Sequence, residues 1–313
     1  MLAFIARRLL ATIPVLAVVA VFVFLLLRLT PGDPAAVIAG ENANAAQIDA
    51  IRGKLGLDQP LATQFVVWIG RVLQGDLGES FFYKKTVAEL IGERLEPTLM
   101  LSLATMVIAI LVAIPMGVLA AYKHDTWIDR ATMAFSVLGF SVPVFVIGYL
   151  LIYVFAIELG WLPVQGYGRL ARGLPNFLER IVLPAATLSV IYIALIARIT
   201  RASVLEVLGE DYIRTARAKG LPEAKILRRH ALRNAAVPIV TVIGIGIALL
   251  IGGAIVTESV YNIPGLGRLV VDAVLARDFP IIQGVILLFS VAYVLVNLAI
   301  DLAYTLFDPR IRY

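Results

Sequence analysis

The sequence predicts an all-α integral membrane protein with six transmembrane helices and a small external helical segment after the first of them. Sixty per cent of its 313 residues are hydrophobic and 16% are charged, whereas soluble domains are nearer half apolar and a quarter charged. The mean hydropathy is +0.92. Six stretches also lack Asp, Glu, Lys and Arg over lengths that can cross a bilayer. Together these observations exclude an ordinary soluble domain.

The charge-free stretches locate the spans, because an ionised side chain at the bilayer centre costs about 2.5–3.5 kcal/mol. About 20 helical residues cross a hydrocarbon core about 30 Å thick. The six stretches contain 17 to 27 residues each. They are 9–27, 97–122, 131–157, 181–197, 234–257 and 279–300. We expect the first to be an uncleaved helix, although Arg7 and Arg8 resemble the start of a signal peptide, because no small-residue cleavage motif follows before Arg28.

The distribution of basic residues predicts that both termini are cytoplasmic. With that orientation the inside segments carry 15 Lys and Arg in 62 residues, and the outside segments carry 12 in 116. Cytoplasmic loops are expected to be the more basic ones. The predicted domains are 1–30 (tail and first helix), 31–96 (external segment), 97–307 (five-helix core with a cytoplasmic loop at 201–236) and 308–313 (cytoplasmic tail). The external segment contains two helical patterns, near 44–55 and 62–74.

Several kinds of chemistry are missing. The chain has no cysteine and two histidines, so thiolate metal sites and a three-histidine site are excluded, and we expect no catalytic, metal or cofactor site. Gly53-Lys54 lacks the flanking residues of a phosphate-binding loop, so ATP must be bound by another chain. No ionisable carboxylate or amine lies within the six stretches, whereas ion-coupled carriers usually need such groups at depth. The membrane region is therefore expected to be a gated pathway driven from elsewhere.

Prolines and glycines interrupt the apolar stretches. Two interpretations stay open: kinked helices that line a pathway, or the general abundance of both residues in membrane helices. The residues concerned are Pro115, Pro143, Pro184, Pro238, Gly244, Gly246, Gly252 and Gly253.

The sequence of segment 210–238, which we name the elbow, predicts a helix, a sharp break and a second helix. Gly220 can end the first helix because it tolerates positive φ, and Pro222 suits the first position of the second. Glu223 complements the N-terminal dipole of that second helix. One face of the second helix should be apolar, and it consists of Ala224, Leu227, Ala231 and Leu232. The alternatives are a basic loop lying on anionic lipid, which would not require the rigid break, and a nucleic-acid site, for which the basic run is too short.

At the elbow the sequence resembles the inner-membrane permease subunits of ABC importers. Their signature is Glu-Ala-Ala, three residues, Gly, nine residues and Ile-x-Leu-Pro. Gly220 matches the glycine and Ala216 the second alanine, while Arg214-Thr215 and His230–Arg233 replace the flanking parts. The form found here is similar to the dipeptide/oligopeptide branch, in the type without an N-terminal extension. Motifs of that branch recur at Thr30–Pro34, Leu55–Leu61, Gly75–Ser80, Ser259–Gly267 and Asp308–Arg310.

The resemblance implies the type I ABC importer transmembrane-domain fold and a bacterial inner-membrane location. It implies three kinds of partner besides membrane lipid: a second homologous permease in a heterodimer, two ATP-binding subunits and an external substrate-binding protein; no nucleic acid is expected. It also implies that the elbow is the coupling helix that docks on an ATPase. The expected ATPase-coupling residues are Arg214, Thr215, Ala216, Gly220, Leu221, Pro222, Glu223, Ala224, Arg228, His230 and Arg233.

Peptides are the expected cargo, because the resemblance is to the peptide branch. The same architecture for nickel, glutathione or another small solute stays open. A stand-alone secondary carrier and a membrane-embedded enzyme are the remaining alternatives, and the uncharged spans disfavour both.

Overall fold

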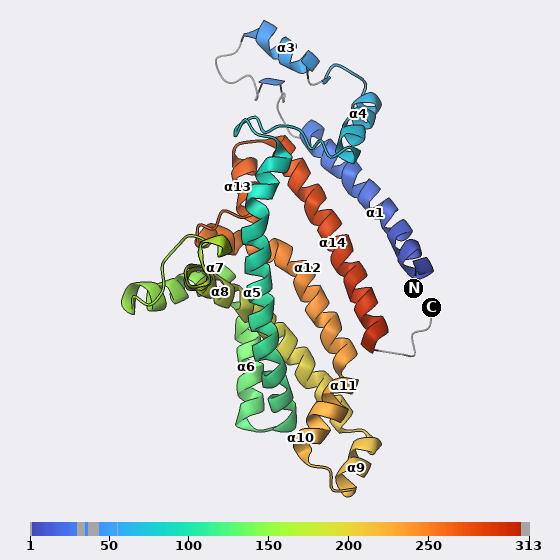
Figure 1. Cartoon of the computed structure of the whole chain (residues 1–313), viewed down its shortest axis with the longest axis vertical. Coiled ribbons are helices and arrows are strands. Elements are labelled where there is room, and N and C mark those ends of the chain that lie inside the picture. The colour runs from blue at the N-terminus through green and yellow to red at the C-terminus, as the bar shows by residue number, and fades with distance from the viewer. Residues whose placement is uncertain (1, 30–34, 37–43, 55, 308–313) are drawn as a thin grey trace. The chain divides into compact units, whose positions relative to one another are not determined.

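The computed structural model describes residues 2–29, 35–36, 44–54 and 56–307 (Figure 1). This part of the chain is helical and contains no strand beyond one isolated antiparallel bridge, between Glu79 and Thr86. The motif Thr30–Pro34, the residue Leu55 and the tail 308–313 lie outside the described residues.

The helices follow one another along the chain, and the longer connections between them include 74–86 and 159–169. In order they are α1 (Leu2–Leu29), α3 (Ala45–Lys54), α4 (Leu61–Leu73), α5 (Val87–Tyr122), α6 (Trp127–Ser141), α7 (Val144–Leu151), the π-helix η1 (Ile152–Glu158), the 3₁₀ turn η2 (Leu170–Arg172), α8 (Leu174–Leu208), α9 (Asp211–Ala218), α10 (Glu223–Lys225), the π-helix η3 (Ile226–Ala231), α11 (Leu232–Asn234), α12 (Ala236–Val260), α13 (Leu266–Leu275) and α14 (Phe279–Phe307). The two helices predicted after the first span, near 44–55 and 62–74, are α3 and α4.

Membrane-spanning capacity agrees with the predicted fold class. Four helices in the described ranges are long and apolar enough to cross a bilayer, and two bent pairs raise the number to six if each pair is one span. The four contain the runs 9–27, 97–122, 181–197 and 279–300, in α1, α5, α8 and α14. The run 131–157 lies within the bent pair Trp127–Ser141 and Val144–Glu158. The run 234–257 lies almost wholly in α12, whose part Ala236–Leu250 forms the other bent pair with the second arm of the elbow. The expectation of six apolar segments is confirmed.

The run 131–157 is not one straight helix. Its two parts, Trp127–Ser141 and Val144–Glu158, differ in direction by 105°. Pro143 causes the break, because proline has no N–H to donate and forces the preceding residue out of the helical region. Val142 is accordingly extended (φ −87°, ψ 124°), and Pro143 becomes the N-cap of α7. Pro115 and Pro184, by contrast, lie inside the continuous helices α5 and α8.

The chain divides into two compact units. The first comprises 1–96 and 268–295, and the second comprises 97–267 and 296–313. In the first unit, the ring of Phe24 on α1 lies edge-on to Phe65 of α4 at 5.2 Å and near Trp68 at 5.6 Å. The Nε2 atom of Gln283 on α14 donates to the carbonyl of Val23 at 3.0 Å. Aromatic packing and a buried hydrogen bond therefore fix α1 to its neighbours in this unit.

In the second unit, α8 is the central helix and contacts α6, α7 and α12. Small residues allow the close approach: a Cβ on Gly117 of α5 would lie 2.6 Å from the carbonyl of Ala197, and one on Gly139 of α6 would lie 2.9 Å from Ala194. The buried hydroxyl of Tyr261 hydrogen-bonds with Thr187 at 2.6 Å and donates to the carbonyl of Gly148 at 3.2 Å. The residue after α12 is thereby tied to α7 and α8.

The glycines of α12 do not share one environment. A Cβ on Gly244 would collide with Ile300, and one on Gly246 would contact Met106 and Tyr192. Gly252 has no neighbour within 4 Å in the described part of the chain, so it makes no close packing contact there. The surroundings of Gly253 lie outside the described residues.

A fully buried carboxylate lies one residue beyond the charge-free run 234–257. Glu258, at the end of α12, accepts a hydrogen bond from the hydroxyl of Thr98 at 2.5 Å. Thr98 in turn accepts from the backbone N–H of Leu266 at 2.8 Å. A side chain on Gly265 would occupy the position of the Glu258 carboxylate. Glu258, which lies outside the charge-free runs, thus holds the turn 262–267 in place.

Candidate functional site

The first helix of the elbow, α9, ends at a Schellman motif. The N–H of Gly220 donates to the carbonyl of Arg217 at 2.9 Å, and the N–H of Leu221 donates to that of Ala216 at 3.2 Å. Gly220 has a φ of +76°, a left-handed conformation that only glycine adopts without strain. The predicted helix stop is therefore confirmed in position and cause.

The second arm differs from the single regular helix that the sequence predicted. Pro222 is the N-cap, with ψ 141°, and the helix begins one residue later at Glu223. After one turn, α10, the backbone widens into the π-helix η3, followed by the short α11. In a π-helix the hydrogen bonds join residues five apart and the turn is wider than in an α-helix, so the apolar face shifts. Ile226 and Ala231, five apart, are fully buried, whereas Ala224 is exposed. The predicted apolar face is wrong at Ala224 for this reason.

Two polar contacts hold the arms of the elbow together. Arg217 donates from Nε to Oε1 of Glu223 at 2.8 Å, across the break. This hydrogen bond raises the pKa of Arg217, because the carboxylate stabilises the guanidinium. Farther along, Asn234 Nδ2 donates to the hydroxyl of Tyr212 at 2.8 Å and to the carbonyl of His230 at 2.9 Å. The bend is therefore closed at both ends.

Apolar packing attaches the elbow to the long helices. Ile213 of α9 and Ile226 of η3 are fully buried. A separate buried cluster joins the elbow to α5, α8 and α12, and its members are Ala121, Val204, Ala231, Ala235 and Ile239. Burying apolar area stabilises this junction by roughly 25 cal/mol for each Å² removed from water. A displacement of the elbow must therefore displace the ends of these three helices.

An ion pair joins the first turn of α6 to α8. The buried Asp129 accepts from Nε and Nη2 of Arg201, the latter at 2.7 Å. The Nδ1 atom of His124 lies 3.0 Å from Oδ2 of Asp129. Potential metal-ligating atoms of His124, Asp125 and Asp129 lie within 4.8 Å of one another. Because the guanidinium already engages both oxygens of Asp129, the arrangement has the chemistry of a salt bridge rather than of a cation site.

The structure brings the predicted coupling residues together on one bent segment. Most of their side chains point into solvent; Ala216, Leu221, Glu223 and His230 are half-buried. Five further residues hold the bend and were not predicted from the sequence: Tyr212, Ile213, Arg217, Ile226 and Asn234. Arg217 and Glu223 could have been found as opposite charges six residues apart across a glycine stop. The π-helical pair Ile226 and Ala231 follows no helical or strand period.

Two family models together match nearly the whole chain. Residues 113–313 match "Binding-protein-dependent transport system inner membrane component", and residues 1–104 match "Binding-prot-dependent transport system membrane comp, N-term". The chain belongs to this family of ABC importer permeases. The permease is thus the membrane component of an ATP-driven importer and a multi-pass protein of the inner membrane. In this family, ATP hydrolysis occurs in partner subunits.

Curated relatives align with the permease from end to end. It is 57% identical over 310 residues to "Probable peptide ABC transporter permease protein y4tP" of Sinorhizobium fredii, covering 99% of each chain. It is 46% identical to "Glutathione transport system permease protein GsiC" of Escherichia coli K12, covering 100% of each.

A solved structure confirms the predicted type I importer fold. The permease resembles a chain of the MetNI methionine ABC transporter, solved in inward-facing conformations, with a TM-score of 0.57 and 20% identity. The similarity covers 70% of the permease and 96% of that chain.

Proposed function

We propose that the permease forms half of a translocation pathway for short peptides, and that its elbow couples this pathway to a separate ATP-hydrolysing subunit. The observation that carries the coupling role is the closed bend itself. A Schellman stop at Gly220, the Arg217–Glu223 pair and the Tyr212–Asn234 hydrogen bond make a stiff projection. A loop that only lay on lipid would need none of these three.

The elbow packs directly against the ends of membrane-spanning helices. Its second arm shares a buried cluster with α5, α8 and α12, and Asp129–Arg201 ties α6 to α8. When two ATPase subunits close on ATP, docked elbows would be pushed together, and the span ends would move with them. Interiors packed this tightly transmit displacement rather than absorb it.

The remaining partners follow from the same mechanism. A second, homologous permease supplies the other half of the pathway, two ATP-binding subunits supply the energy and an external binding protein delivers the cargo. Both termini and the elbow lie in the cytoplasm, in agreement with the excess of basic residues on that side. The permease itself binds no nucleotide and catalyses no reaction.

The cargo is proposed from the relatives. One is named for peptides and one for glutathione, which is itself a short peptide. The described spans offer no dedicated charged site for a metal ion, since the charge-free runs contain no carboxylate. Peptide uptake that is blocked by excess unlabelled dipeptide but not by nickel would support this assignment.

The coupling role is tested by removing the break. The permease is reconstituted in vesicles with its sister permease, the two ATPases and the binding protein, and ATP-driven peptide uptake is measured. Deletion of 220–224, or Gly220→Pro, is expected to abolish uptake and to weaken recovery of the ATPases with the permease. Normal uptake with normal ATPase association would show that the elbow does not couple.

A further inference from the structure

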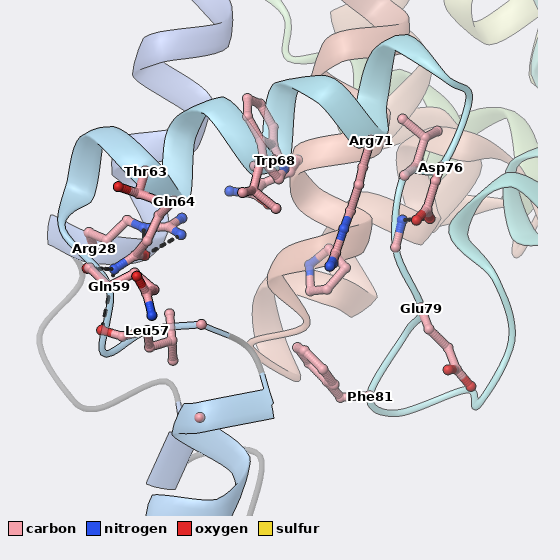
Figure 2. Close-up of a pocket in the computed structure, with 17 residues that line it drawn as sticks. Arg28, Leu57, Gln59, Thr63, Gln64, Trp68, Arg71, Asp76, Glu79 and Phe81 are labelled. Carbon is pink, nitrogen blue, oxygen red and sulfur yellow. Dashed lines mark hydrogen bonds between the residues drawn. The ribbon is translucent and has the colours of Figure 1, made fainter.

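The first unit contains a pocket of about 430 Å³ that the transport mechanism above does not use. It lies where α1 ends, against one face of α4, the loop 76–81 and the start of α14 (Figure 2). Its size is within the range of small-molecule sites, about 300–1,000 Å³. The surrounding walls are fixed: Oδ2 of the buried Asp278 accepts from the hydroxyl of Ser80 at 2.5 Å and from the N–H of Phe82 at 3.1 Å.

A half-buried cation stands at one end of the pocket. The guanidinium of Arg28 stacks on Phe24, 3.7 Å from the ring centroid, and donates to Oε1 of Gln64 at 2.8 and 3.2 Å. Gln64 is held in turn by the carbonyls of Leu57 and Gln59, at 3.3 and 2.7 Å. Arg28 is half-buried and has no carboxylate partner among the described residues. A positioned cation without a counter-ion is stabilised by an anion.

The other groups of the pocket carry both signs of charge. Figure 2 shows Arg28 with Gln59 and Gln64 at one end, Asp76 and Glu79 at the other, and Arg71 reaching into the space between. Asp76 accepts a hydrogen bond from the N–H of Gly78 at 2.9 Å. In the described part of the chain, neither Arg71 nor Glu79 has a side-chain hydrogen bond or ion pair. Opposite charges that share a pocket without pairing leave room for a ligand between them.

We propose that this pocket binds a zwitterion, with its anionic group at Arg28 and Arg71 and its primary ammonium group at Asp76 and Glu79. Guanidinium groups bind phosphate and carboxylate with paired N–H donors. A primary ammonium donates three hydrogen bonds to carboxylates, which a quaternary ammonium cannot do. Trp68 and Phe81 supply apolar wall between the charged ends.

Two sources carry this chemistry. One is the phosphatidylethanolamine headgroup, because Arg28 directly follows the charge-free run 9–27 and so lies at headgroup level. The other is the free termini of a short peptide in the surrounding solution. The binding does not depend on the coupling role of the elbow, and it is measured without ATP, so the two proposals fail independently.

The test uses the assembled transporter without its binding protein. In one arm, native mass spectrometry compares the retention of phosphatidylethanolamine with that of phosphatidylcholine. In the other, equilibrium binding compares a radiolabelled dipeptide with the same dipeptide blocked at both termini. The variants are Arg71→Gln and Glu79→Gln, both at exposed positions of the pocket. The matched controls are Arg172→Gln and Glu179→Gln, which are exposed outside the pocket.

We expect each pocket variant to lower the binding affinity for one of the two probes about tenfold, which is the effect of losing one charge-assisted hydrogen bond. Neither control should change the affinity for either probe. Loss in the lipid arm identifies a headgroup, and loss in the dipeptide arm identifies a peptide. The proposal is overturned if both probes bind the pocket variants as they bind the wild type. It is also overturned if phosphatidylcholine and the blocked dipeptide bind as well as the probes with a primary ammonium group.

Discussion

The guanidinium of Arg217 and the carboxylate of Glu223 meet at 2.8 Å across the break of the elbow, three residues on either side of Gly220. Both side chains are partly exposed, at 41% and 37%, so the pair adds little to global stability. Its effect is geometric: it fixes the angle between α9 and the second arm. We therefore expect the pair to matter for the transmission of movement rather than for folding.

The first prediction concerns the charges of Arg217 and Glu223. Glu223→Arg should lower binding-protein-stimulated ATP hydrolysis and peptide uptake up to about fivefold, because an exposed ion pair contributes about 0.2–1 kcal/mol and repulsion now opposes the bend. The double variant Arg217→Glu/Glu223→Arg should recover most of the lost activity. Failure of the double variant to recover would show that Glu223 acts by touching another subunit and not by closing the elbow.

The second prediction concerns the positive φ of Gly220. Gly220→Ala adds a methyl group in open space, with no neighbour within 4 Å among the described residues, so sterics within the chain are not at issue. The φ of +76° costs an alanine about 1–2 kcal/mol. Uptake should fall severalfold. Gly220→Asn should be closer to wild type, because asparagine tolerates this conformation better. Equal losses in both variants would indicate that the absence of a side chain, not the backbone angle, is required.

The third prediction concerns the ion pair between Asp129 and Arg201. Asp129→Asn should lower the apparent melting temperature of the purified complex, since it leaves Arg201, only 19% exposed, without its charge partner. The expected loss is on the order of 2 kcal/mol. Asp125→Asn is the matched control: Asp125 is exposed and has a φ of +62°, which asparagine accepts. An equal effect of the two substitutions would refute a specific role for the ion pair.

The glycines of α12 give a fourth, paired prediction. Gly244→Ala should destabilise the permease, because the new Cβ would collide with Ile300 and overpacking costs about 1–3 kcal/mol. Gly252→Ala should be neutral or slightly stabilising in the isolated permease, since alanine is the better helix former. The comparison is made by thermal unfolding in detergent. If Gly252→Ala instead prevents assembly with the sister permease, that glycine faces the partner.

The positions of the apolar helices could be predicted from the sequence because a charge inside the bilayer is costly, and runs without charge therefore mark the spans. Proline could not be interpreted in the same way. Pro184 lies inside a continuous helix, whereas Pro143 begins a new one at a 105° bend. The difference depends on what packs against each segment, and the local sequence does not contain that information.

For the elbow, the Gly220 stop followed from local chemistry, but the shape of the second arm did not. The five-residue spacing of Ile226 and Ala231 exists only because the backbone widens into a π-helix. Asp129 and Arg201 are 72 residues apart, and no pattern in one sequence pairs them. The pocket near Arg28 likewise assembles from segments far apart in the sequence: the end of α1, one face of α4, the loop 76–81 and the start of α14.

Site-specific cross-linking from the elbow tests the coupling role most directly. The chain has no cysteine, so a single introduced one is a unique probe. Arg214→Cys and Arg228→Cys place a thiol on exposed elbow positions, and Arg172→Cys is the control at an exposed position that the proposed orientation puts outside. In the assembled transporter, we expect both elbow thiols to cross-link to an ATPase subunit and to resist impermeant reagents in intact cells. Elbow thiols that are labelled from outside, or that reach no ATPase, would contradict the coupling role.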